Sequence, residues 1–190
     1  YSFDCTTIYS TSKTNKDEYK FKVMNENLKF LKEVFESESL PEESLPEFVF
    51  WGRSNVGKSS LINSITKSKI AKTSKTPGRT RSLVFFEFEK KIRIIDFPGY
   101  GYSKIPKFNE FKIDRLIENY LTQRQVLKFI FLLIDARHGI MEIDKKILDQ
   151  LDKILGRKVI IIFTKIDKLK NQDDKQNLLR NNEQINQIFD

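Results

Sequence analysis

A glycine-containing loop between an apolar stretch and a helical stretch most constrains what this chain can fold into. Residues 52–59 read Gly-Arg-Ser-Asn-Val-Gly-Lys-Ser, the spacing G-x-x-x-x-G-K-[ST] of a loop that wraps phosphates. Its glycines permit backbone conformations that turn successive N–H groups inward around an anion. Residues 46–51 before it predict a strand, and residues 60–65 after it begin a helical pattern. An ordinary glycine-containing turn is the alternative, and the flanking strand and helix favour phosphate binding.

Two side chains of the loop have predicted roles. Lys58 would reach the β- and γ-phosphates of a nucleotide, and the Ser59 hydroxyl would bind Mg²⁺. The helix beginning near Lys58 directs its positive end at the same anion. The sequence therefore predicts a nucleoside triphosphate and Mg²⁺ as ligands.

Strand and helix patterns alternate along the rest of the chain. Apolar runs predict strands at 83–88, 92–96, 129–134 and 159–163, of which the first two form an antiparallel pair around a tight turn. Helical spacing predicts helices at 25–38, 108–123 and 142–155, the first from Leu28, Leu31, Val34 and Phe35. We expect an α/β fold in three layers, with a mostly parallel, doubly wound sheet, one antiparallel edge strand, and ligands at the strand ends.

Length and composition fit one domain with a polyanionic partner. We divide the 190 residues into a flexible arm, 1–24, rich in Ser, Thr, Lys and Tyr, and a folded domain, 25–190. The 34 Lys and Arg residues exceed the 26 Asp and Glu residues, which favours a polyanion. No apolar run approaches the roughly 20 residues that cross a bilayer, so we expect no membrane association. Cys5 is the single cysteine, which favours a reducing compartment.

Two motifs after predicted strands specify the nucleotide. Asp96-Phe97-Pro98-Gly99 has the D-x-x-G spacing, in which the Asp holds Mg²⁺ through its outer shell and the Gly N–H contacts the γ-phosphate. Thr164-Lys165-Ile166-Asp167 follows the last predicted strand. The Asp167 carboxylate could accept both N1–H and the exocyclic amine of guanine, whereas adenine offers neither donor at that edge. Each motif alone also fits a surface turn, but together with the phosphate loop they favour a GTPase over an ATPase or a kinase.

The segment Lys75-Thr76-Pro77-Gly78-Arg79-Thr80 supplies a candidate for the remaining protein ligand of Mg²⁺. A hydroxyl in this interval must complete the coordination once the γ-phosphate is present. We expect Thr80 to do so, because the preceding Pro-Gly suits a loop that closes over the ion. Thr76 and Thr73 are the alternatives.

The blocks GRSNVGKSSLIN, SKTPGRTR, DFPGYGYSK, DARHG and TKIDKL together resemble the EngB family of ribosome-biogenesis GTPases over residues 45–170. The resemblance implies a Ras-like P-loop GTPase domain, GTP or GDP with Mg²⁺, and a role in assembly of the large ribosomal subunit. The implied partners are the precursor of that subunit and its rRNA. The implied Mg²⁺ ligands are Ser59 and Thr80. The nucleotide-binding residues that it implies are Gly52, Arg53, Ser54, Asn55, Val56, Gly57, Lys58, Ser59, Ser60, Gly78, Thr80, Asp96, Phe97, Pro98, Gly99, Thr164, Lys165 and Asp167.

The chain departs from the family pattern in two places. Arg81 stands where the family usually has Gln after TPGRT. No final strand and Ser-rich guanine loop follow the TKID motif, so we expect these elements to be missing from 25–190. Either the chain is truncated or its base binding is incomplete.

The expected catalytic residues are Lys58, Thr80 and Asn55. Tyr100 occupies the position where Ras-type enzymes have the Gln that places the attacking water, so we expect slow hydrolysis without a partner. Asn55 is similar to the Asn at this place in related GTPases, which bind K⁺ beside the α- and γ-phosphates, where the ion substitutes for an arginine finger. The resemblance implies that Asn55 helps to seat K⁺ here, and a purely structural role in the loop is the alternative. A catalytically weak GTPase-like module, kept as a structural component of a ribosomal particle, is the rival function.

Six basic residues without an intervening acidic one follow the phosphate loop: Lys67, Lys69, Lys72, Lys75, Arg79 and Arg81. This run predicts contacts with RNA phosphates, and a solvated lysine-rich loop is the alternative. We expect a monomer when the chain is not on the ribosome. The expected location is the cytoplasm in a bacterium, or the mitochondrial or plastid matrix in a eukaryote.

Overall fold

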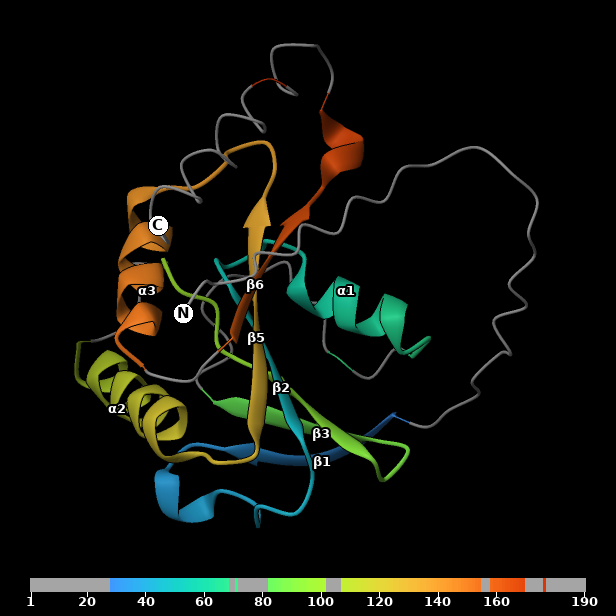
Figure 1. Ribbon diagram of the computed structural model, residues 1–190, viewed down its shortest axis with the longest axis vertical. Helices are drawn as coiled ribbons and strands as arrows, with labels where there is room; N and C mark the ends of the chain where they lie inside the picture. The colour runs from blue at the N-terminus through green and yellow to red at the C-terminus, as the bar shows by residue number, and fades with distance from the viewer. Residues whose placement is uncertain are drawn as a thin grey trace.

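A six-stranded sheet between two layers of helices makes up the described part of the chain (Figure 1). The computed structural model describes residues 28–68, 71, 82–101, 107–154, 158–169 and 176, with the backbone alone for 107–110 and 158. The strands are β1 (Leu28–Val34), β2 (Glu47–Gly52), β3 (Leu83–Phe88), β4 (Ile92–Asp96), β5 (Leu127–Asp135) and β6 (Lys158–Thr164). The α-helices are α1 (Lys58–Ile65), α2 (Lys107–Gln123) and α3 (Glu142–Asp152), and the short 3₁₀ helices are η1 (Ser37–Ser39) and η2 (Ile166–Lys168).

The strand order in the sheet is β1-β3-β4-β2-β5-β6. Strands β4, β2, β5 and β6 are parallel, and β3 pairs antiparallel with both β4 and β1. The prediction of a mostly parallel, three-layer α/β sheet is confirmed. The antiparallel strand β3 is one place in from the edge, because β1 covers it.

The helix predicted over 25–38 is wrong in the described part of that range, because Leu28–Val34 form strand β1. Phe30 pairs with Phe86 and Lys32 with Phe85, so Leu31 is an extra residue in β1, a β-bulge. The bulge reverses the alternation of side chains. Leu28 and Val34 therefore pack on opposite faces of the sheet although six positions separate them. A strand of this kind shows no period of two, which explains why its apolar spacing resembled a helix.

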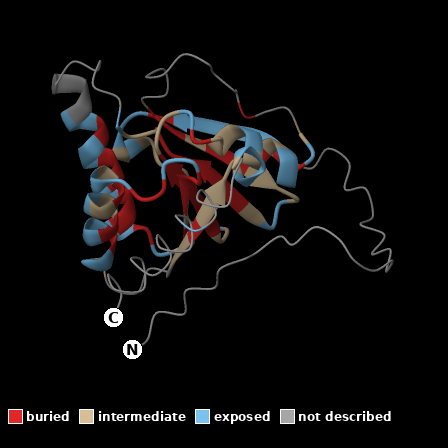
Figure 2. Ribbon diagram, turned by 90° about the horizontal axis from the view of Figure 1, so that it is seen from above, coloured by how far each residue is buried: buried red, intermediate tan, exposed pale blue. Residues whose placement is uncertain are grey.

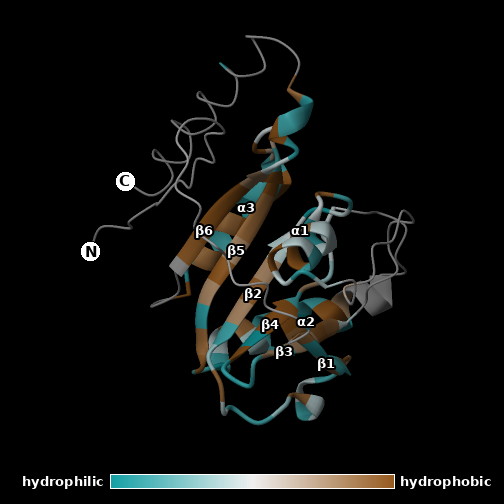
Figure 3. Ribbon diagram, turned by 90° about the vertical axis from the view of Figure 1, so that its right-hand side faces the viewer, coloured by the Kyte–Doolittle hydropathy of each residue, from teal (hydrophilic) through white to brown (hydrophobic). Residues whose placement is uncertain are grey.

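The two faces of the sheet bury separate apolar clusters. One cluster lies under α2 and α3 and includes Leu116, Tyr120 and Leu148, and the other lies under α1 and includes Ile62. Buried residues line the sheet and the inward faces of the helices, whose outward faces are exposed (Figure 2). The hydropathy of β5 and of its neighbour β6 matches this coverage by helices, since both strands are almost uniformly apolar (Figure 3).

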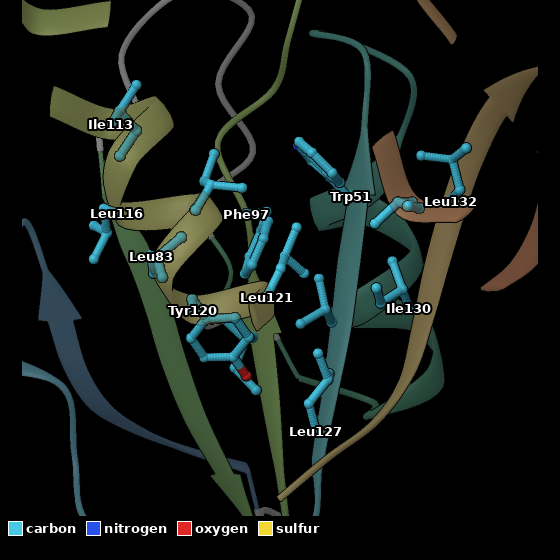
Figure 4. Packing of buried hydrophobic residues seen from close by; sticks show 14 of the residues in the cluster. Trp51, Leu83, Phe97, Ile113, Leu116, Tyr120, Leu121, Leu127, Ile130 and Leu132 are labelled. Atoms are coloured by element: carbon cyan, nitrogen blue, oxygen red, sulfur yellow. The ribbon is translucent and has the colours of Figure 1, made fainter. Parts of the chain in front are cut away.

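Aromatic rings connect α2 to the middle of the sheet. The ring of Phe97, directly after β4, lies between α2 and Trp51 of β2 (Figure 4). Its centroid is 5.5 Å from that of Trp51 and 5.3 Å from that of Tyr120, both in edge-to-face geometry. The indole Nε1 of Trp51 donates a hydrogen bond of 3.2 Å to the carbonyl of Pro98. The start of the D-x-x-G segment is thus anchored in the core.

The carboxyl ends of the parallel strands meet at one edge of the sheet. Strands β2, β4, β5 and β6 end there at Gly52, Asp96, Asp135 and Thr164. Ligands bind at this edge in doubly wound sheets.

None of the described helices has the length and apolar character needed to cross a bilayer.

Several predicted features fall outside the described residues. They are the arm 1–24, the segment 72–81 with Gly78 and Thr80, and most of the tail after Leu169. Of the six basic residues between the phosphate loop and β3, only Lys67 is described.

Candidate functional site

The loop between β2 and α1 has the backbone geometry of an anion cradle. Asn55 and Gly57 adopt φ values of 63° and 107°, in the left-handed region. Leu61 is the first residue whose N–H bonds within α1, to the Gly57 carbonyl at 2.9 Å. The N–H groups of the three preceding residues, 58–60, therefore point out of the helix end, where they can bind an anion.

The D-x-x-G segment lies directly against this loop. Tyr100 N–H donates to the Gly52 carbonyl at 3.3 Å, and Ser54 N–H donates to the Tyr100 carbonyl at 3.1 Å. A Cβ added at Gly99 would lie 2.9 Å from Ser54 Oγ and 3.0 Å from Ser54 N. Only glycine fits this approach. The backbone of Gly99 is consequently held beside the phosphate loop by two hydrogen bonds of its neighbour.

Lys58, Ser59 and Asp96 meet between the two segments. Lys58 Nζ forms an ion pair with Asp96 Oδ1, and both side chains are mostly buried. Ser59 Oγ lies 3.5 Å from Asp96 Oδ2. A hydroxyl beside a carboxylate is an oxygen-only donor set, which suits Mg²⁺. Within the described residues no group of three or more His, Cys, Asp or Glu side chains could hold a metal, so such an ion would complete its shell with water and phosphate oxygens.

The end of β6 also contacts the phosphate loop. Thr164 Oγ1 donates to the Val56 carbonyl at 2.7 Å, and Lys165 Nζ donates to the Asn55 carbonyl at 2.6 Å. Asp167 follows in η2 and is exposed. The three sequence motifs, predicted separately from residues far apart in the chain, therefore occupy one place.

Asp135 belongs to this site, although the sequence reasoning gave it no role. It ends β5 and accepts a hydrogen bond of 2.8 Å from Lys165 Nζ and bonds of 2.9 and 2.7 Å from Arg137 Nε and Nη2. Burial disfavours the charged carboxyl, but the hydrogen bonds from Arg137 and Lys165 outweigh it and hold its pKa well below the ordinary value. The signal that could have identified it is an Asp directly after a buried parallel strand.

A second set of contacts missed by the sequence reasoning surrounds Arg53. Its Nε lies 3.4 Å from Asp144 Oδ1, its Nη2 donates to the Gly139 carbonyl at 3.1 Å, and its Nη1 contacts the Met141 sulfur. Tyr100 Oη donates to the same Asp144 oxygen at 2.8 Å. No signal in the sequence identifies Asp144, because it reads as an ordinary acidic residue in the first turn of a helix.

The environment of Tyr100 keeps its hydroxyl protonated. Burial, the charge of Asp144 and the hydrogen bond to that carboxylate raise the pKa of Tyr100 far above its ordinary value, and Arg53 opposes the shift only in part. Its ring packs edge-to-face on Trp51 with centroids 5.6 Å apart. The side chain is therefore directed into the protein.

The predicted site residues fall into three groups. Residues 52–60, 96–99 and 164–167 come together at the strand ends as expected. Phe97 is buried in the core, so only its backbone can face the site. Gly78 and Thr80 lie outside the described residues.

Comparison with known proteins identifies the family. The profile described as "50S ribosome-binding GTPase" matches residues 47–165. The "Probable GTP-binding protein EngB" of Metamycoplasma arthritidis is 48% identical over 147 residues, which cover 77% of this chain and 79% of that protein. The protein of the same name from Chlorobium phaeobacteroides is 44% identical over 147 residues, covering 77% of this chain and 76% of its own.

A solved structure agrees with these relatives. The crystal structure of a probable GTP-binding protein EngB superimposes with a TM-score of 0.55 at 30% identity, covering 70% of this chain and 78% of that one. Together with the phosphate loop, the D-x-x-G segment and the TKID motif gathered at one edge of the sheet, these matches show that the chain belongs to the EngB family of GTP-binding GTPases.

Proposed function

We propose that this GTPase is a switch that binds GTP with Mg²⁺, hydrolyses it, and assists assembly of the large ribosomal subunit. The observation that supports this most directly is the meeting of Lys58, Ser59 and Asp96 beside the free N–H groups of α1. This arrangement supplies a cation, a metal-binding hydroxyl and a carboxylate at one anion cradle.

In this proposal each phosphate-facing group has a distinct task. Lys58 would turn its ammonium from Asp96 toward the β- and γ-phosphates, which would leave the Asp96 carboxylate to support the metal site. Ser59 and Thr80 would be the protein ligands that hold Mg²⁺. The backbone N–H of Gly99 contacts the γ-phosphate. Bound Mg²⁺ would neutralise charge that develops on the phosphate oxygens.

The guanine base would be held by the TKID motif. Asp167, exposed after β6, accepts from N1–H and from the exocyclic amine, and the Lys165 stem lies along the base. The bonds from Lys165 to Asn55 and Asp135 fix that stem on the phosphate loop. The hydrogen bond from the Thr164 hydroxyl to the Val56 carbonyl stabilises the same loop.

Unassisted hydrolysis should be slow. The Tyr100 hydroxyl donates to Asp144, and its ring packs on Trp51, so this side chain is not available to place the attacking water. A catalytically weak, structural role on a ribosomal particle is the second candidate function, and the orientation of Tyr100 is the observation that favours it.

K⁺ could offset the missing catalytic side chain. Asn55 is exposed at the left-handed turn of the phosphate loop, where a side-chain oxygen could reach an ion beside the phosphates. We expect single-turnover hydrolysis to be faster in KCl than in NaCl, and the difference to disappear in Asn55→Ala. Equal rates in the two salts would count against the ion role.

The ribosomal partner is supported by the family description and by the charge of the chain. The excess of eight positive charges and the basic run after the phosphate loop suit an rRNA surface. Binding to purified large-subunit precursors should weaken steeply with added salt. An affinity that does not depend on salt would contradict the proposed contact with rRNA. We also propose that the protein is a monomer in solution and that it is located where such ribosomes assemble.

Nucleotide selectivity tests the proposal as a whole. Titration of the full chain with fluorescent GTP, GDP and ATP, with and without Mg²⁺, should give tight, Mg²⁺-dependent binding of GTP and no binding of ATP. Single-turnover hydrolysis then separates the two candidate functions. A measurable rate that rises on addition of ribosomal precursors supports the switch, and GTP binding without turnover under either condition supports the structural module.

A further inference from the structure

We propose that Asp144 is a positioning residue that holds the D-x-x-G segment against the phosphate loop, and so sets the preference for a triphosphate over a diphosphate. The inference rests on the proposed function in one respect, since it takes the γ-phosphate to be bound by the Gly99 N–H. It concerns a residue of α3 that none of the nucleotide motifs contains.

One carboxylate oxygen joins the two segments. Asp144 Oδ1 accepts the Tyr100 hydroxyl at 2.8 Å and lies 3.4 Å from Arg53 Nε. Tyr100 directly follows Gly99, and Arg53 is the second residue of the phosphate loop. The other oxygen, Oδ2, accepts the Met141 N–H at 2.8 Å at the start of α3, so the carboxylate is itself fixed to a rigid element.

Burial makes this junction stiff. The Asp144 side chain is fully buried, and that of Arg53 is 14% exposed. Moving either charge away from its partner would leave an unpaired charge in the protein interior, which is strongly unfavourable. The Tyr100 ring is also confined by its edge-to-face contact with Trp51.

The junction acts on the backbone next to Gly99. Tyr100 makes main-chain hydrogen bonds to Gly52 and from Ser54, and Gly99 has no space to approach Ser54 more closely. Removing the Tyr100 hydroxyl releases the outer end of this segment while leaving the phosphate loop intact. The affinity for GDP, whose phosphates end at the loop, should therefore change little. The affinity for a nucleotide whose γ-phosphate is bound by the Gly99 N–H should fall.

Tyr100→Phe is the test variant, because it removes only the hydroxyl and keeps the ring on Trp51. We expect its affinity for GMPPNP, a non-hydrolysable GTP analogue, to fall roughly three- to tenfold, as part of one hydrogen bond to a charged group is lost. Its affinity for GDP should stay within about twofold of the unmodified chain. Titration with fluorescent derivatives of both nucleotides measures the ratio.

Tyr120→Phe is the matched control. Tyr120 is also a buried phenol that donates to a buried carboxylate, Glu47 Oε2 at 2.6 Å. Its hydroxyl lies at the start of β2, at the other end of that strand from the phosphate loop, and Tyr120→Phe keeps the ring that packs on Phe97. It should lose stability without changing the ratio of GMPPNP to GDP affinity. Asp144→Ala is a second variant. If the Tyr100 hydroxyl acts through this carboxylate, adding Tyr100→Phe to Asp144→Ala should cause no further change in the ratio of GMPPNP to GDP affinity.

The outcomes separate this inference from the proposed function. An unchanged ratio in Tyr100→Phe, or an equal loss of both affinities, overturns the positioning role while nucleotide binding by the unmodified chain still stands. If the unmodified chain binds neither nucleotide, the proposed function fails, and the positioning role fails with it. A selective loss of GMPPNP affinity in Tyr100→Phe and not in Tyr120→Phe supports it.

Discussion

In the proposed function, single residues at the strand ends decide which nucleotide this chain binds. Asp167 is the side chain assigned to the guanine edge, and Asp167→Asn replaces one acceptor by an amide donor. GTP affinity should fall about 100-fold, because a donor would then face the exocyclic amine. Xanthosine triphosphate, which has a carbonyl at that position, should gain affinity. Competition titrations with both nucleotides measure the exchange.

A surface carboxylate on α3 provides the control for this exchange. Asp149→Asn makes the same chemical change at an exposed position away from the strand ends and should alter neither affinity. Equal loss of GTP and xanthosine triphosphate in Asp167→Asn would show that the residue supports the fold and does not read the base.

Asp135 gives a prediction about pH at the same scale. Its folded pKa is depressed, so it stabilises the fold above its unfolded pKa of about 3.9, and this contribution is lost as the pH falls through the lower folded value. Asp135→Asn should lower the free energy of unfolding by about 2 kcal/mol between pH 5 and 8, since Lys165 and Arg137 lose a charged acceptor.

Denaturant unfolding of both forms over a pH series checks the sign. The difference between the unmodified chain and Asp135→Asn should be constant above about pH 5 and shrink below about pH 4. A difference that grows on acidification would mean that Asp135 is protonated in the folded chain.

The motifs predict which residues meet at the site, but not what holds them there. Lys58, Ser59 and Asp96 belong to patterns whose spacing carries their chemistry, and the structure brings them together as expected. Asp144 lies 91 positions from Arg53 and 44 from Tyr100 in the chain, and contacts across such separations leave no local signal.

At the scale of elements, the hairpin between β3 and β4 has a turn whose backbone its sequence does not favour. Glu89 and Lys90 adopt φ values of 52° and 55°, a conformation that side chains with a Cβ disfavour. Lys90→Gly should raise the free energy of unfolding by about 0.5–1 kcal/mol, because it removes this strain at an exposed position. Urea unfolding monitored by circular dichroism measures the change.

A Lys-to-Gly substitution in a strand should change the free energy of unfolding in the opposite direction. Lys29 is exposed in β1, where its backbone is extended, so Lys29→Gly should destabilise the chain by roughly 0.5–1 kcal/mol. Destabilisation by Lys90→Gly would show that the turn adopts another conformation in solution.

Most elements could be predicted because they are buried on one or both faces. The apolar runs of β5 and β6 and the helical spacing of α2 and α3 reflect that burial directly. Strand β1 could not, because its pairing partners in β3 are 49 to 60 residues away and its bulge at Leu31 removes the alternating pattern.

At the scale of the whole molecule, a buried carboxylate ties the layers together at the start of β2. Glu47 is fully buried and accepts hydrogen bonds from Arg124 at 2.7 and 2.8 Å and from Tyr120 at 2.6 Å, and Arg93 Nη1 lies 3.3 Å from it. Arg93 is in β4, Tyr120 is in α2, and Arg124 directly follows the last residue of α2. The cluster therefore joins two strands to the end of the helix that follows the D-x-x-G segment.

Replacing this carboxylate should weaken the fold without altering the site. Glu47→Gln leaves Arg93 without its ion-pair partner in the interior and leaves Arg124 with only the longer contact of 3.9 Å to Glu43, so the free energy of unfolding should fall by about 3 kcal/mol. Glu142→Gln, in an exposed pair with Lys145, should cause no measurable change. Guanine nucleotide affinity, measured well below the unfolding temperature, should be the same in both variants because Glu47 lies at the opposite end of β2 from the phosphate loop. Weaker nucleotide binding by folded Glu47→Gln would instead mean that the packing of Tyr120 on Phe97 transmits the change to the D-x-x-G segment.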